Sequence, residues 1–214
     1  MFGEIDDEVK GEEGRSSYNV DYLIKDFKSI VEAYMAEARW LDRNKIPTVE
    51  EYLNVSTVTN CSAFITNCSA FMSMSHFICM GDIFATEDIF KWAKSQPQII
   101  QATNVIGRLM NDIVSREFAH KKEHIALSVE CCMKEKGVTR PEAIDELRKM
   151  IKSAWKNINE ECLKPTQVPI PFLMVVLNYA RFLDVIYKDA DAYTHSEGTM
   201  KEFISLLFVD PVPI

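Results

Sequence analysis

The residues best suited to chemistry lie close together in residues 108–124. Asn111 and Ser115 are four positions apart, a spacing that places an amide oxygen above a hydroxyl on one face of a helix. Position 119 completes the row, and three oxygens in such a row can hold a divalent cation such as magnesium. Ala119 stands there and offers no oxygen. The pattern therefore predicts a weak cation site with two neutral oxygen ligands.

Two cationic side chains flank this row. Arg108 lies one turn before Asn111, so its guanidinium group can approach the same ligand, and Lys122 lies further along the segment. Either one could instead be an ordinary surface residue. Asp112 is adjacent to Asn111 and points elsewhere on a helix, so we interpret it as a structural acid and only a weaker candidate for a metal ligand.

A helix must position these side chains. No glycine or proline interrupts residues 108–124, and Leu109, Ile113 and Phe118 recur at helical spacing. Pro97 is well placed near the start of such a helix, and Gly137 is well placed at its end. We therefore predict one helix over residues 97–134 that carries the whole row.

The rest of the chain follows helical patterns too. Residues 20–41 carry a wide apolar face, which predicts a core helix. Thr48 with Glu51, and Thr139 with Glu142, have the form of capping boxes that start helices. Further helices are expected from residue 86, over 172–187 and over 199–208, with a polar loop at 188–196. No segment favours a sheet, so the predicted fold class is all-α.

One internal repeat interrupts this regularity. Residues 59–65 are followed directly by residues 66–72, which are identical in six of seven positions. Seven residues are nearly two helical turns, so the repeat keeps the apolar face aligned within about 20°. It moves everything after it by about 10 Å along the axis. We favour a helix here, and a β-strand is the competing interpretation because Thr, Val, Phe and Cys are not strong helix formers.

Composition limits the classes of function. The 214 residues suffice for one domain with a sizeable core, and the net charge of −8 argues against a general nucleic-acid surface. The six cysteines form no CxxC pair, so no zinc site is indicated. No secretory signal is visible, and no apolar stretch is long enough to span a membrane. We therefore expect reduced thiols and a cytoplasmic protein.

Taken in order, the motifs resemble those of class I terpene synthases. The sequence Asn-Asp-Ile-Val-Ser-Arg-Glu-Phe-Ala at residues 111–119 is similar to the second metal-binding motif of that family, (N/D)DxxSxxxE, with Ala119 in place of the final Glu. Matching stretches, similar to plant sesquiterpene synthases of the germacrene and cadinene type, lie at residues 20–22, 34–41, 47–53, 154–160 and 193–195. The resemblance covers nearly the whole chain.

The resemblance implies a partial class I terpenoid synthase helical bundle. Residues 1–17 are then an acidic, poorly ordered segment, and residues 18–214 are the C-terminal part of the metal-binding α-domain. The implied reaction is that of a carbon–oxygen lyase, the ionisation and cyclisation of farnesyl diphosphate with release of diphosphate. Magnesium is the implied cofactor, with manganese as an alternative.

The resemblance also assigns roles to residues. It implies that Arg108 and Lys122 bind the substrate diphosphate. It implies that Asn111 and Ser115 bind the metal, with Asp112 as a further candidate. Tyr187 and Asp191 fall in the loop that closes over the loaded site in this family and are the candidate catalytic residues. The alternative is that they are ordinary surface residues of a polar loop.

Two departures from the family pattern indicate impaired activity. The aspartate-rich DDxxD motif is absent, because the chain begins downstream of it, and Ala119 removes a carboxylate from the motif that remains. Magnesium then lacks its usual protein donors. The alternative hypothesis is a non-catalytic helical fragment, the product of a pseudogene or an interaction module. Apolar faces left uncovered by absent helices would favour self-association.

Overall fold

The computed structural model describes residues 18–60, 87–115, 126–163 and 165–209. These ranges contain helices and no strand, so the predicted all-α fold class is confirmed for the described part of the chain. In chain order the helices are α2 (Tyr18–Asp42), α3 (Val49–Thr59), α5 (Glu87–Lys94), α6 (Gln98–Val114), α8 (Ser128–Lys136), α9 (Arg140–Glu161), α10 (Ile170–Ile186) and α11 (Thr199–Phe208).

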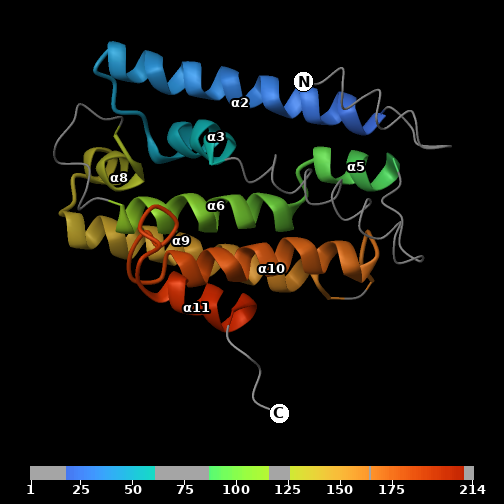
Figure 1. Cartoon of the computed structure of the whole chain (residues 1–214). Coiled ribbons are helices and arrows are strands. Elements are labelled where there is room, and N and C mark those ends of the chain that lie inside the picture. Colours follow the sequence, from blue (N-terminus) through green and yellow to red (C-terminus); the bar gives the residue numbers. More distant parts are fainter. Residues whose placement is uncertain (1–17, 61–86, 116–125, 164, 210–214) are drawn as a thin grey trace.

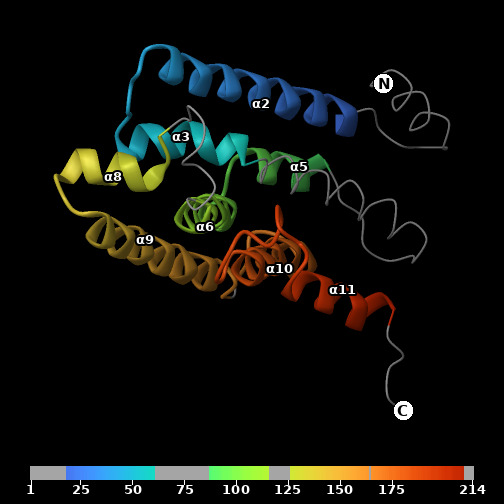
Figure 2. The ribbon, with the colours of Figure 1, turned by 60° about the vertical axis from the view of Figure 1, so that its left-hand side comes forward.

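Helix α6 is the centre of the bundle. It contacts α9 and α10 on one side and α3 and α8 on the other, while α2 forms an outer layer over α3 (Figure 1). Figure 2 views α6 almost end-on, with α3 above it and α9 and α10 below it. Its apolar residues lie on several faces, and Ile99, Ile106 and Leu109 are fully buried, as expected for a helix enclosed by others.

Two apolar clusters flank α6. One joins its N-terminal half to α5, α9 and α10, and the other joins its C-terminal half to α3, α8 and α9. Leu109 of α6 packs in the second cluster with Tyr52 of α3 and Leu147 of α9. Burial of this apolar surface is the main force that holds the helices together.

The predicted helix starts are correct where capping boxes mark them. The Thr48 hydroxyl accepts a hydrogen bond from Glu51 N at 3.1 Å, and Glu51 in turn accepts one from Thr48 N. Thr139 N donates to the Glu142 carboxylate at 2.8 Å at the start of α9. Gly137, with φ of 65°, ends α8 in the left-handed conformation that glycine adopts without strain.

The prediction of α2 as a core helix is wrong. The helix itself spans Tyr18–Asp42, but Phe27, Val31 and Met35 are exposed, and among its described side chains the buried ones form a narrow stripe that includes Ile30 and Ala33. The reason is that α2 makes its main contacts with α3 and α5 alone, on one side of the helix. Its wide apolar face therefore remains uncovered in the described part of the chain.

The prediction of one helix over residues 97–134 is also wrong. Helix α6 ends at Val114, Ser115 is its C-cap residue, and a new helix, α8, begins at Ser128. Ser128 N donates a hydrogen bond at 3.1 Å to the buried carboxylate of Asp112, so the start of α8 lies back against α6. A straight helix cannot make that contact. Most of the repeat at residues 59–72, and the acidic segment at residues 1–17, lie outside the described residues.

Asp112 is a polar junction inside the bundle. It is fully buried on α6, and its Oδ2 atom accepts hydrogen bonds from the Tyr52 hydroxyl at 2.8 Å and from Ser128 N at 3.1 Å. Its Oδ1 atom forms an ion pair with Arg108 at 2.6 Å. One carboxylate thus connects α3, α6 and α8.

The junction predicts a specific loss of stability in the variant Tyr52→Phe. Removal of the phenolic hydroxyl takes one donor from a buried carboxylate, and we expect the free energy of unfolding to fall by about 2 kcal/mol. Urea unfolding followed by circular dichroism measures this value. The matched control is Tyr193→Phe, because Tyr193 is 76% exposed and should tolerate the change. Equal stability of the two variants would contradict the prediction.

Candidate functional site

Arg108 is held in the middle of the candidate site by α6. Besides its ion pair with Asp112, it donates a hydrogen bond to Oδ1 of Asn111. Burial is the largest single influence and would by itself lower the pKa of the guanidinium group, but the charge and hydrogen bond of Asp112, together with the charges of Tyr52 and Glu37, outweigh it and the pKa of Arg108 is raised. Arg108 therefore stays charged inside the bundle.

Asn111 and Ser115 keep the spacing that the sequence predicts. Ser115 N donates to the carbonyl oxygen of Asn111 at 2.9 Å, which continues the helical geometry through the last residue of the turn. The Asn111 side chain also hydrogen-bonds the phenol of Tyr187, which lies directly after α10. The amide is therefore fixed in orientation between Arg108 and Tyr187.

Tyr187 and Asp191 join the site from a distant part of the sequence. Both are buried, and burial followed by the nearby Asp191 charge raises the pKa of Tyr187, while Arg108 acts in the opposite direction. The fold thus brings together Arg108 and Asn111 of α6 with Tyr187 and Asp191 of the loop after α10. Tyr193, in the same loop, is exposed and takes no part in this cluster.

The loop that carries Asp191 has its own internal support. The Asp191 carboxylate accepts hydrogen bonds from Thr194 N at 3.0 Å and from the Thr194 hydroxyl at 2.6 Å. Ala192 N donates to the carbonyl oxygen of Ile186 at 3.0 Å, which ties the loop to the end of α10. This is the pattern by which an aspartate side chain organises a turn.

Among the four members of this cluster, Asp112 pairs with Arg108. Its two oxygens are engaged by Arg108, Tyr52 and Ser128, so it serves as a structural acid that holds Arg108 in place. A metal ion at Asp112 would have to displace these donors. Ala119 and Lys122, the other two positions of the predicted site, lie outside the described residues.

Glu37 is a buried acid that the sequence analysis missed. It lies on α2, accepts a hydrogen bond from the Thr59 hydroxyl at 2.7 Å, and is close enough to Arg108 and Asp112 for their charges to act on it. Burial raises the pKa of Glu37, although the Thr59 hydrogen bond and Arg108 oppose the shift. A signal for it was available, because Glu37 continues the helical stripe of Ile30 and Ala33.

The described donors fit a divalent cation only weakly. Asn111 and Ser115 supply an amide oxygen and a hydroxyl, and the Asn111 oxygen already accepts a hydrogen bond from Arg108. Within the described ranges, no three side chains of His, Cys, Asp or Glu gather as a metal cluster. Magnesium prefers carboxylates and fills the rest of its octahedron with water or phosphate oxygens. A metal ion here would therefore depend on such outside ligands.

Tyr187 also lines a cavity of about 590 Å³. Met110 and Ile144 form part of its apolar wall, and Arg140 and Lys188 are also at its surface. Arg108 and Asn111 do not line it. The candidate site is thus a buried polar cluster at one end of α6, and Tyr187 is the residue that it shares with the lining of this cavity.

The helical bundle, with Arg108, Asn111, Tyr187 and Asp191 gathered at one end of α6, can be compared with known proteins. The chain belongs to the terpene synthase family: the pattern described as "Terpene synthase family, metal binding domain" matches residues 1–157. The predicted resemblance is therefore confirmed.

Relatives in plants agree with this assignment. The chain is 43% identical over 214 residues to a (-)-germacrene D synthase of Vitis vinifera, covering 100% of this chain and 37% of that protein. It is 42% identical over 212 residues to a probable sesquiterpene synthase of Santalum murrayanum, covering 99% of this chain and 36% of that protein. The chain thus spans a little over a third of the length of these relatives.

Solved structures share the fold. The structure of abietadiene synthase from Abies grandis superimposes with a TM-score of 0.81 at 21% identity, over 99% of this chain and 26% of that one. Isoprene synthase from grey poplar, in complex with three Mg²⁺ ions and dimethylallyl-S-thiolodiphosphate, gives a TM-score of 0.78 at 23% identity, over 99% of this chain and 38% of that one. At these identities the likeness establishes the fold alone. Among the described helices, none combines the length and the hydropathy needed to cross a membrane.

The raised pKa of Glu37 predicts how stability depends on pH. The folded protein binds the Glu37 proton more tightly than the unfolded chain, whose pKa is near 4.5, so this residue favours folding at low pH. That contribution is lost as the pH rises through the folded pKa. We expect Glu37→Gln to match the wild type below pH 4.5 and to gain stability relative to it above that pH, as measured by urea unfolding.

Glu51→Gln is the control, because the contribution of Glu51 to stability should change with pH in the opposite direction. The hydrogen bond from Thr48 N, followed by one from Lys45, lowers the pKa of Glu51, so its contribution is present above pH 4.5 and is lost as the pH falls. This variant should therefore lose stability relative to the wild type at neutral pH. A Glu37→Gln variant that became less stable than the wild type as pH rises would contradict the account of the buried carboxyl.

Proposed function

We propose that this chain carries part of a sesquiterpene synthase site, which ionises and cyclises farnesyl diphosphate with magnesium and releases diphosphate. One observation carries the proposal: Arg108 and Asn111 of α6 lie together with Tyr187 and Asp191 of the loop after α10. Helices α8, α9 and α10 separate these two pairs of residues in the sequence. Family membership and relatives named as germacrene D and sesquiterpene synthases support it. Geranyl diphosphate is an alternative substrate of the same chemistry.

Each residue has a proposed role. Arg108 binds the diphosphate with its fork of donors, and Lys122 adds a second cation. Asn111 and Ser115 contribute oxygens to magnesium or manganese, which when bound neutralises charge on the leaving diphosphate. Tyr187 and Asp191 close the site from the loop after α10 and exclude water, and Tyr187 also holds the Asn111 side chain in place.

We further propose that activity is impaired. The positive charge of Arg108 is already paired with Asp112, so a diphosphate must compete with a buried carboxylate. Asn111 offers its oxygen to Arg108, so a metal must compete there too. Ala119 removes a carboxylate from the motif. These three features together weaken both metal and diphosphate binding.

Restoring the carboxylate tests the proposed function. We expect a non-hydrolysable farnesyl diphosphate analogue to bind in the presence of magnesium, and to bind roughly tenfold more tightly to Ala119→Glu, because a charged oxygen ligand strengthens a magnesium site. Isothermal titration calorimetry, with and without a chelator, measures this. Ser153→Glu adds the same charge to the exposed side of α9 and is the control.

Two results would count against the proposal. One is binding that does not depend on magnesium, and the other is an Ala119→Glu variant that binds no better than Ser153→Glu. Product analysis after incubation with farnesyl diphosphate and magnesium adds a test of turnover. Cyclic hydrocarbons indicate catalysis, whereas farnesol and other solvolysis products alone indicate that the chain does not cyclise its ligand.

The second candidate function is that of a non-catalytic helical module that associates with a second copy of itself. Helix α11 favours it, because its last turn exposes Leu206, Leu207 and Phe208, the last of which is 82% exposed. Contiguous exposed apolar side chains of this kind mark association surfaces. Exposed Phe27 and Val31 belong to α2, which lies on the opposite side of the bundle from α11, and they form a second, separate apolar surface.

Sedimentation velocity over a range of concentrations tests this association. We expect reversible dimers or larger species. The double variant Leu207→Lys with Phe208→Lys should shift the protein toward monomer, because it replaces two exposed apolar side chains with charged ones. Lysine is tolerated there, since a positive charge is favourable at a helix C-terminus. Leu163→Lys is the control, because Leu163 is 69% exposed and follows α9 instead of belonging to α11. Equal association of both variants would exclude α11 as the interface.

We also propose a reducing compartment such as the cytosol. Among the described cysteines, Cys131, Cys132 and Cys162 are free thiols, and burial raises the pKa of Cys131 to about 12. A thiol of this kind stays protonated and unreactive. Such cysteines are typical of proteins that are not exposed to oxidising conditions.

A further inference from the structure

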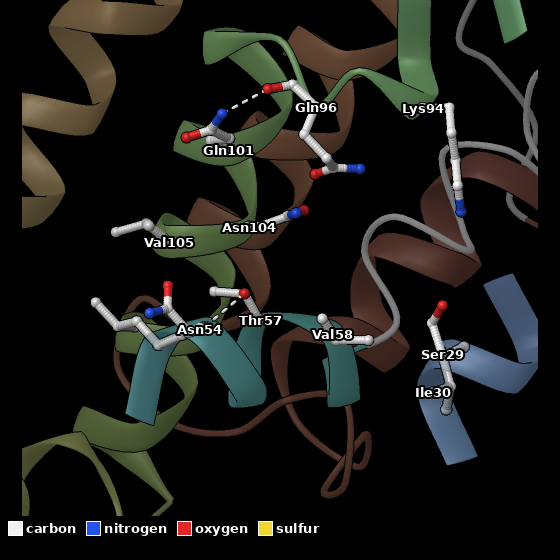
Figure 3. A pocket seen from close by; sticks show the side chains of 11 residues that line it. Ser29, Ile30, Asn54, Thr57, Val58, Lys94, Gln96, Gln101, Asn104 and Val105 are labelled. Carbon is white, nitrogen blue, oxygen red and sulfur yellow. Dashed lines mark hydrogen bonds between the residues drawn. The ribbon is translucent and has the colours of Figure 1, made fainter. Parts of the chain in front are cut away.

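A second cavity, of about 400 Å³, lies between the outer layer and the centre of the bundle. It is bordered by α2, α3, the end of α5 and the first half of α6, and Figure 3 shows it from close by. Its described lining consists of Ser29, Ile30, Leu53, Asn54, Thr57, Val58, Lys94, Gln96, Gln101, Asn104 and Val105. None of the residues assigned to the diphosphate site lines it.

Asn104 is the most informative of these residues. It is only 5% exposed, and its side-chain oxygen Oδ1 has no hydrogen-bond partner. Figure 3 shows the side chain leaving α6 toward the space among the other labelled residues. Buried polar atoms in folded proteins are nearly always hydrogen-bonded, so an unpartnered acceptor that faces a cavity indicates a missing donor.

Two hydroxyl groups at the cavity present acceptors as well. The Thr57 hydroxyl donates its proton to the carbonyl oxygen of Leu53 at 2.6 Å, and the Ser29 hydroxyl donates to the carbonyl oxygen of Lys25 at 3.1 Å. Each hydroxyl has one proton to give and two lone pairs to accept with. Since the protons are used within the helices, Thr57, Ser29 and Asn104 all offer acceptor oxygens to a ligand.

The wall around these acceptors is otherwise neutral and partly apolar. Among the described lining residues, Lys94 is the one ionisable side chain and no carboxylate is present. A cationic ligand is therefore disfavoured. Ile30, Leu53 and Val58 provide apolar surface for C–H groups, and Gln101 is fixed by a hydrogen bond to the backbone oxygen of Gln96 at 2.5 Å.

We propose that this cavity binds a small neutral polyol, such as a monosaccharide or a cyclitol. Such a molecule donates several hydrogen bonds from hydroxyl groups, carries no charge, and presents C–H faces to an apolar wall. The cavity volume is in the range of ordinary small-molecule sites. The site is independent of the proposed diphosphate chemistry, because the two share no residue and the polyol needs no metal.

Ligand-observed NMR and calorimetry with glucose and myo-inositol test the site in the full chain, with a chelator present so that the diphosphate site holds no metal. We expect saturable binding of at least one of these polyols. Cyclohexanol, with one hydroxyl group, should bind roughly tenfold more weakly, since it leaves the other acceptors without donors. Absence of saturable binding by both polyols, or equal binding of cyclohexanol, overturns the proposal.

Variants locate the site. Asn104→Leu and, separately, Thr57→Val should each weaken polyol binding by about tenfold, since each removes one acceptor oxygen. Thr103→Val is the matched control, because Thr103 is the neighbour of Asn104 on α6, is buried, and does not line the cavity. If Asn104→Leu fails to fold, Thr57→Val decides alone. Binding that is equal in the wild type and in every folded variant overturns the assignment.

Discussion

The buried ion pair between Arg108 and Asp112 is the interaction on which the rest of this structure depends. Both residues belong to α6, and the Asp112 carboxylate also accepts hydrogen bonds from Tyr52 of α3 and from the backbone at the start of α8. A buried charge is tolerated only when its partners are present, because desolvation of an unpaired charge is costly. The Asp112 carboxylate therefore favours the packing of α3 and α8 against α6, and the start of α8 lies back against α6 where Ser128 N reaches it.

The same pair links the fold to the candidate site. Asp112 holds Arg108 in one position, Arg108 in turn engages Asn111, and Asn111 hydrogen-bonds Tyr187 of the distant loop. These contacts hold the side chains in position before any ligand binds, and such preorganisation favours binding. It also limits affinity, because Arg108 is already paired with Asp112 and the Asn111 side-chain oxygen already accepts a hydrogen bond from Arg108. The chain spans little more than a third of the length of its plant relatives, so other parts of those proteins are not represented in this bundle.

Local signals in the sequence predicted much of the architecture. The capping boxes at Thr48 and Thr139 set helix starts, and Gly137 set an end, because these features depend on residues within one turn. Local signals failed where tertiary contacts decide. The return of the chain to Asp112 and the exposed face of α2 depend on packing partners that periodicity does not reveal. The proximity of Arg108 and Asn111 to Tyr187 was expected only through family resemblance. Glu37 was missed because, in sequence alone, a single buried acid on a helix is easily mistaken for an acid on the solvent-exposed face.

The most direct test of the central claim is a double-mutant cycle on the buried pair, measured as the free energy of unfolding in urea. Arg108→Met leaves the Asp112 carboxylate unpaired and should destabilise the fold by about 3 to 5 kcal/mol. Adding Asp112→Asn removes that charge but keeps an oxygen that can accept from Tyr52 and Ser128, so the double variant should be more stable than Arg108→Met alone. If the two losses simply add, the ion pair is not the interaction that organises this bundle, and the account given for its fold and site is wrong.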